Sequence, residues 1–274
     1  MKAAGTGYTR GVSDSVSVSP GTFSLARNIF RALFTVPPFL LQHLWRRRRV
    51  RDVTHTVDRL SEPAPDPSGI ERSTEPDVQA AADGDGPLVL RSYEVDIRRA
   101  DLSPEQLIER LLARPADLND DRIAGFVRDD APATDLRVDD ELVVELPGPW
   151  NGPVRVTRAG PSGLLLQTLN GHMEAGQIRF DTTDHSHRSD GTHDYRFRIR
   201  SWARGGDRAF TLLHLGLRVA KELQTAMWVA MCEGAVTVSG GEREGRISVI
   251  TEVLDDSTEP GDTVGEVMEK VGGN

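Results

Sequence analysis

The stretch YRFRIRSW, residues 195–202, decides the fold expected of this chain. Its apolar residues alternate with arginines, which is typical of an antiparallel strand with one face in a core and the other in water. A long helix is expected to follow over residues 208–235, because apolar residues cover most of its circumference. Further strands are predicted over residues 88–97, 141–146, 154–157, 164–169 and 176–182.

A shorter helix is predicted between the first two strands. Ser103 suits the N-cap, Pro104 suits the first helical position, and Gln106 completes a capping box. Strand, helix, several antiparallel strands and one long helix give an α+β order. The natural packing lays the long helix across one face of a curved sheet, and an apolar cavity between the two would form a ligand site.

The flanks of this predicted domain, residues 88–241, have different compositions. Residues 1–60 are expected to form a basic amphipathic extension, and residues 61–87, rich in proline and acidic side chains, a disordered linker. Residues 242–274 are expected to form an acidic tail with a short strand. Residues 1–51 carry nine basic side chains and one acidic, a net of +8; the whole chain carries −9, so the remainder carries −17. Such a body is a poor partner for nucleic acid, and none is expected.

The basic extension has two interpretations. Its amphipathic segment and the arginine run that follows could lie on an anionic membrane surface, with aromatics in the headgroup boundary and arginines on lipid phosphates. It could instead be a flexible tail, or a helix that docks on the domain. The residues expected at the membrane are Phe30, Phe34, Arg46, Arg47, Arg48 and Arg49.

Several other features argue for a cytoplasmic protein, peripheral on the inner face of the membrane if the extension binds lipid. The best apolar stretch, residues 29–45, is too short and too interrupted for a transmembrane span. The single cysteine, Cys232, allows no intramolecular disulfide and is expected to be a small buried hydrophobe.

His185, His187 and His193 are interpreted as a solvated hairpin tip, because no cysteine accompanies them. No metal and no cofactor are expected.

Four short motifs carry a resemblance to a known family: GPWNGPVRV at 148–156, TLNGHMEAG at 168–176, SWAR at 201–204 and KELQ at 221–224. Together they resemble an uncharacterised branch of the START-like (SRPBCC) superfamily, close to the family called DUF nineteen-ninety. The resemblance covers residues 88–241. It implies a helix-grip fold, in which a curved antiparallel sheet wraps around a long C-terminal helix and encloses a cavity. Members of the wider superfamily carry lipids, plant hormones or polyketide intermediates, and a few are cyclases or hydratases.

His172 and Glu174 are weak candidates for a catalytic pair, since Glu174 could orient His172 as a general base. The interpretation we favour is that His172 bonds a backbone group and fixes its turn, because no nucleophile is visible nearby. Arg204 could hold a ligand carboxylate or pair with Glu174. The residues expected to contact a ligand are Trp150, Trp202, Arg204, Gln224 and Trp228.

Three functions therefore remain open. The leading hypothesis is binding of a hydrophobic or lipid-like small molecule between sheet and long helix, without catalysis. The second is a cyclase- or hydratase-like enzyme that acts in the same cavity through His172 and Glu174. The third is a membrane-surface interaction protein that has no ligand cavity.

Overall fold

The computed structural model describes residues 50–119, 125–129, 131–145, 151–187, 189–206 and 214–254. The amphipathic segment with Phe30 and Phe34, the arginine run Arg46–Arg49, and Trp150 lie outside these residues.

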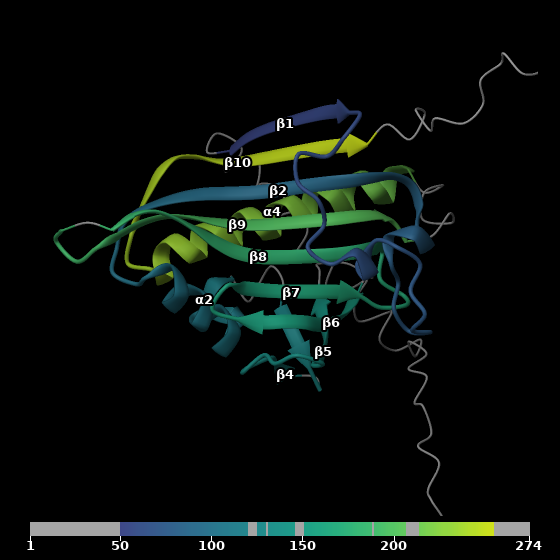
Figure 1. The fold of residues 1–274 in the computed structure, drawn as a ribbon, viewed down its shortest axis with the longest axis horizontal. Helices are drawn as coiled ribbons and strands as arrows, with labels where there is room; N and C mark the ends of the chain where they lie inside the picture. The colour runs from purple at the N-terminus through teal and green to yellow at the C-terminus, as the bar shows by residue number, and fades with distance from the viewer. Residues whose placement is uncertain are drawn as a thin grey trace, which may run out of the picture.

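Within the described residues, ten strands form one mixed sheet in the order β1-β10-β2-β9-β8-β7-β6-β5-β3-β4 (Figure 1). The strands are β1 Val50–Val57, β2 Asp85–Ala100, β3 Gly125–Arg128, β4 Ala131–Pro132, β5 Glu141–Glu145, β6 Asn151–Gly160, β7 Gly163–Thr168, β8 Glu174–His187, β9 His193–Gly205 and β10 Glu242–Leu254. The α-helices are α2 Pro104–Ala113 and α4 His214–Val238, and the short 3-10 helices are η2 Pro67–Gly69, η3 Ala81–Asp83 and η4 Pro115–Leu118.

The expected helix-grip class is wrong. A large mixed sheet dominates the described fold, rather than a sheet wrapped around a C-terminal helix. Helix α4 lies across one face of that sheet (Figure 1), and the 13-residue strand β10 follows it in the chain. Strand β10 pairs antiparallel with β2 and parallel with β1, so both flanks of the predicted domain extend its sheet.

Some local predictions are confirmed. Ser103 caps α2 by accepting a hydrogen bond from the Gln106 amide at 3.3 Å, and Gln106 Oε1 accepts one from the Ser103 amide at 2.8 Å. In β9, Tyr195, Phe197 and Ile199 are fully buried, as their alternation predicts. Cys232 is also buried, and burial raises the pKa of its thiol.

Residues 61–87 differ from the expected disordered linker. Most of them belong to a segment that we call the strap, residues 58–84, which crosses the sheet on the face opposite α4 (Figure 1). Ala80 and Ala81 are fully buried, and the backbone amide of Gln79 donates to the Thr168 carbonyl at 2.9 Å. The strap has few large hydrophobic side chains, and backbone hydrogen bonds at Asp77 and Gln79 tie it to the sheet.

The sheet therefore has two different faces. Its inner face packs on α4, with Phe180 of β8 edge-on to Trp228 of α4 at 5.5 Å between ring centroids. Its outer face carries the arginines of β9, and the strap covers one of them, Arg200, so that it is 1% exposed.

Among the described helices, none has the length and apolar composition needed to cross a bilayer.

Candidate functional site

The predicted ligand residues that the structure describes lie on opposite faces of the sheet. Trp202 is on the outer face, where its indole Nε1 donates to the Glu62 carbonyl of the strap at 3.0 Å. Arg204, two residues on, donates to the carbonyl of Gly86. Gln224 and Trp228 belong to α4 on the inner face. The four residues therefore do not line one site.

His172 lies in the turn before β8, where Gly171 adopts a φ of +92° that suits glycine. Its ring Nδ1 accepts a hydrogen bond from the Glu174 amide at 2.9 Å, and its own amide donates to the Leu169 carbonyl at 3.0 Å. Burial lowers the pKa of His172, which favours the neutral ring. Because Nδ1 already accepts a hydrogen bond from the backbone, its lone pair is not available to act as a general base.

The strap fastens this same turn through one side chain. Gln79 is 7% exposed, and its Nε2 donates to the carbonyls of His172 at 3.0 Å and Glu174 at 3.2 Å. Its Oε1 accepts from the Gly171 amide at 3.2 Å. The position of Glu174 at the start of β8 therefore depends on a residue of the segment expected to be disordered.

The carboxylate of Glu174 belongs to a polar cluster on the inner face. Arg91 of β2 is 8% exposed, and its guanidinium donates to Thr251 Oγ1 at 3.3 Å and to Gln224 Oε1 at 3.2 Å. Gln224 Nε2 donates in turn to Glu174 Oε2 at 2.8 Å. The amide of Gln224 thus stands between a buried cation and a carboxylate.

The guanidinium of Arg91 is hydrogen-bonded to uncharged groups. Burial acts to lower the pKa of Arg91, but Tyr93 and Glu174 outweigh it, and the pKa lies above its usual value. In the part of the chain that the structure describes, no carboxylate lies within ion-pair distance of its guanidinium. A buried charge is costly unless it is paired, which makes Arg91 the most unusual polar group of the inner face.

Arg91 was missed from the sequence, although a signal was available. In the first predicted strand it shares the phase of Tyr93, Val95 and Ile97, so period-two alternation places it on the apolar face. An arginine in phase with a strand's buried residues is an exception that identifies a candidate functional residue.

A second unusual group lies on the same helix. Trp228 is 3% exposed, and among the described residues no acceptor lies within hydrogen-bond distance of its indole Nε1. It follows Gln224 by four positions on α4, so the two side chains lie on the same side of the helix.

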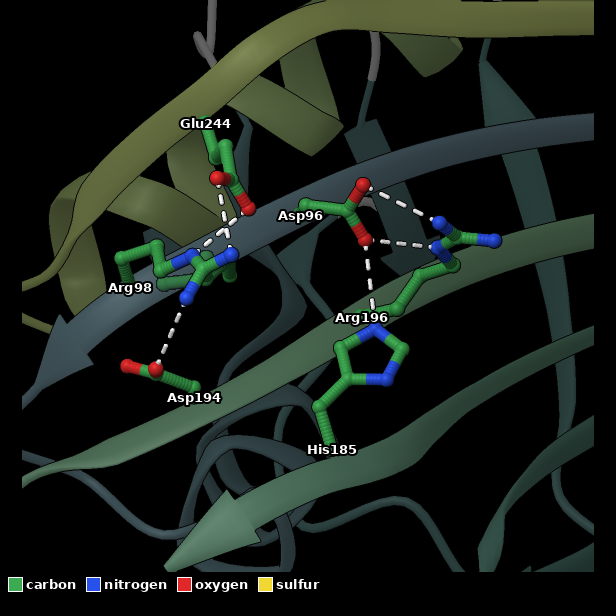
Figure 2. Close-up of a pocket in the computed structure, with 7 residues that line it drawn as sticks. Asp96, Arg98, His185, Asp194, Arg196 and Glu244 are labelled. Carbon is green, nitrogen blue, oxygen red and sulfur yellow. Dashed lines mark hydrogen bonds and ion pairs between the residues drawn. The ribbon is translucent and has the colours of Figure 1, made fainter. Parts of the chain in front are cut away.

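The outer face holds a polar pocket of about 240 Å³ (Figure 2). Arg98 pairs there with Glu244 at 2.6 Å and with Asp194 at 3.2 Å, while Arg196 pairs with Asp96 at 2.7 Å. The pocket is lined by Asp96, Ile97, Arg98, His185, Asp194, Arg196 and Glu244.

Both arginines of this pocket are paired with carboxylates of its lining. Although burial acts to raise the pKa of Asp96, contacts with Arg196 and His185 (the latter at 3.3 Å) outweigh it and lower that pKa. Ligand pockets usually measure about 300–1,000 Å³, and this one is smaller. We therefore interpret the outer-face pocket as a set of cross-strand ion pairs. The inner-face cluster around Arg91 is the better candidate site. Among the described residues, no group of three or more side chains is arranged to hold a metal ion.

No protein-family model matches this chain, and no curated protein matches it. The relationship to the START-like superfamily therefore stays a prediction.

Proposed function

We propose that this protein binds a small organic anion with an apolar body, without catalysis, and that Arg91 holds the anionic group. The observation that carries the proposal is a buried guanidinium whose partners among the described residues are the side-chain oxygens of Thr251, Gln224 and Tyr93, with no carboxylate at ion-pair distance. A planar guanidinium can make two parallel hydrogen bonds to a carboxylate, which is a stronger arrangement than bonds to neutral oxygens. A ligand carboxylate would displace the Gln224 amide oxygen from Arg91.

The surroundings of Arg91 favour an apolar body for the ligand. Arg91 pairs in register with Ser201 of β9 and Thr251 of β10. The inner-face positions two residues from these partners include Ile199, Ala203 and Val249, all buried. An anion with a hydrocarbon chain would satisfy the guanidinium and extend along this apolar strip.

The geometry does not favour the enzymatic alternative. A general base needs a free lone pair directed at its substrate, whereas the Glu174 amide occupies Nδ1 of His172. The Glu174 carboxylate accepts from Gln224 instead of orienting the imidazole. These contacts support a role for His172 in the turn.

The test uses hexanoate, octanoate, decanoate and dodecanoate, with the corresponding alcohols as uncharged controls. We expect at least one carboxylate to raise the melting temperature of the full chain, since a ligand at a hundredfold excess over Kd stabilises by about 2.7 kcal/mol. The matched alcohol should have a much smaller effect. Arg91→Met should abolish the difference between acid and alcohol, while the protein stays folded because methionine fills a similar apolar volume.

The control variant is Arg246→Met, which removes an exposed arginine of β10 and should bind like the wild type. The proposal is overturned if no carboxylate binds, or if carboxylates bind Arg91→Met as tightly as the wild type. Circular dichroism of each variant checks that it is folded.

A second proposal concerns the basic extension. Strand β1 begins at Val50, directly after the arginine run, and lies at the edge of the sheet beside β10. Arg51 of β1 is exposed and continues the run. This position supports binding of residues 22–51 to an anionic membrane surface at one edge of the domain, which would place the protein on the inner face of the membrane.

A further inference from the structure

Trp228 presents a buried donor for which the described residues supply no acceptor. The indole Nε1 can only donate, and buried donors in folded proteins almost always have a partner. The side chain is 3% exposed, yet no acceptor lies within hydrogen-bond distance of Nε1 in the described part of the chain. Its ring packs edge-on against Phe180 at an interplanar angle of 69°, a contact that does not use the N–H group.

Trp202 shows that the lack of a partner at Trp228 is not general in this protein. Trp202 is 1% exposed, on the outer face, and its Nε1 donates to the Glu62 carbonyl at 3.0 Å. Both indoles are therefore buried, but within the described residues the one on the outer face has an acceptor and the one on the inner face has none.

The unused donor lies close to the proposed anion site along α4. Gln224, which contacts Arg91, precedes Trp228 by four residues. Side chains four apart on a helix have Cβ atoms about 5–6 Å apart and share a face. A ligand whose anionic group lies on Arg91 and whose body runs along α4 toward its C-terminus would meet the indole after roughly one helical turn.

We infer that the ligand carries, besides its anionic group, an oxygen that accepts a hydrogen bond from Trp228 Nε1, so that its class is an oxo- or hydroxycarboxylate with an apolar chain. This inference rests on the proposed function, because Arg91 provides the fixed end of the ligand. It adds a specificity residue: Arg91 selects the charge, and Trp228 selects the oxygen in the chain.

The experiment compares decanoate with its oxo derivatives, the ketone placed in turn at each carbon from the fourth to the seventh. Affinities are measured by titration calorimetry with the full chain. At least one oxo acid should bind the wild type about tenfold more tightly than decanoate, the gain expected from one buried hydrogen bond. Trp228→Phe should lose this preference while still binding decanoate. Trp202→Phe, the matched control, should keep the preference.

A second measurement does not depend on a variant folding well. In the wild type labelled with ¹⁵N, the indole N–H resonance of Trp228 should move downfield with the preferred oxo acid and much less with decanoate. That of Trp202 should not move with either.

The two proposals fail in different ways. If no carboxylate binds, or if binding persists in Arg91→Met, the proposed function is wrong and this inference falls with it. If decanoate binds through Arg91 but no oxo acid is preferred, or if Trp228→Phe keeps the preference, the proposed function stands and only the role of Trp228 is wrong.

Discussion

Replacing Asp181 with asparagine would remove a buried negative charge that three arginines share. Asp181 lies on the outer face of β8, and its side chain is 2% exposed. Its carboxylate pairs with Arg179 at 2.8 Å, with Arg198 at 2.9 Å, and with Arg200. The side chain of Arg200 is itself 2% exposed and also pairs with Glu62 of the strap.

The expected cost follows from this geometry. Removing one partner of a buried ion pair typically costs about 3–5 kcal/mol, because the remaining charge stays buried without its partner. For a domain of this size, each kcal/mol lowers the melting temperature by roughly 2–4 °C, so Asp181→Asn should lower it by roughly 10 °C. The free energy of unfolding would be measured in urea by far-ultraviolet circular dichroism.

The matched control is Asp96→Asn on the same face of the sheet. Asp96 also pairs with an arginine, Arg196, but its side chain is 31% exposed. Exposed ion pairs contribute about 0–1 kcal/mol, so this variant should be nearly as stable as the wild type. Equal losses in the two variants would refute the argument that burial decides the contribution of each pair.

Three further predictions concern other parts of the chain. Burial lowers the pKa of His172 below the unfolded value near 6.5. As the pH falls, the unfolded chain therefore binds a proton at this residue before the folded chain does. The free energy of unfolding should decrease below about pH 6.5, by at most about 1.4 kcal/mol per pH unit. His172→Gln should flatten this part of the urea-derived stability profile; an unchanged slope would mean that other groups cause it. Gly234→Ala should destabilise by about 1–3 kcal/mol in urea unfolding, because its Cβ would meet the Leu118 carbonyl; the gain of up to about 1 kcal/mol usual for this change in a helix would contradict that packing. The full chain should co-sediment with anionic vesicles, and added salt should weaken this strongly, because each basic residue near the surface contributes about 1 kcal/mol of binding free energy. Deletion of residues 1–49 should abolish co-sedimentation. Equal co-sedimentation of the two proteins would remove the membrane proposal.

Local signals in the sequence predicted local structure well. The capping residues around Ser103 identified α2, and alternation at 195–202 identified a strand and its buried face, because both patterns depend on near neighbours in the chain. Strands β1 and β10 were less visible. Residues 50–57 and 242–254 pair with segments far away in the sequence. Their mixed polar composition alone predicts an N-terminal extension and a C-terminal tail, because the pairing is not visible in the sequence.

The candidate site was harder to predict for a related reason. Gln224 and Trp228 were identified from their place on the helix, but Arg91, which contacts Gln224, was not, since a single arginine in a strand is usually solvated. The strap was misread because it is held by backbone hydrogen bonds, which side-chain composition does not report. Trp202 and Arg204 share the phase of Arg196, Arg198 and Arg200, so period-two alternation along the strand already places them on the outer face, away from Gln224.

The pairing of β1 with β10 has a consequence for the order of folding during synthesis. Val50 pairs with Ile247, so the ribosome must add almost two hundred residues after β1 before its partner exists. At about 5–20 residues per second, this delay lasts roughly 10–40 s. Throughout it, the backbone groups of β1 that pair with β10 in the finished fold lack that partner. A nascent chain stalled before β10 should therefore be sensitive to protease near residue 50, and release of the full chain should end that sensitivity.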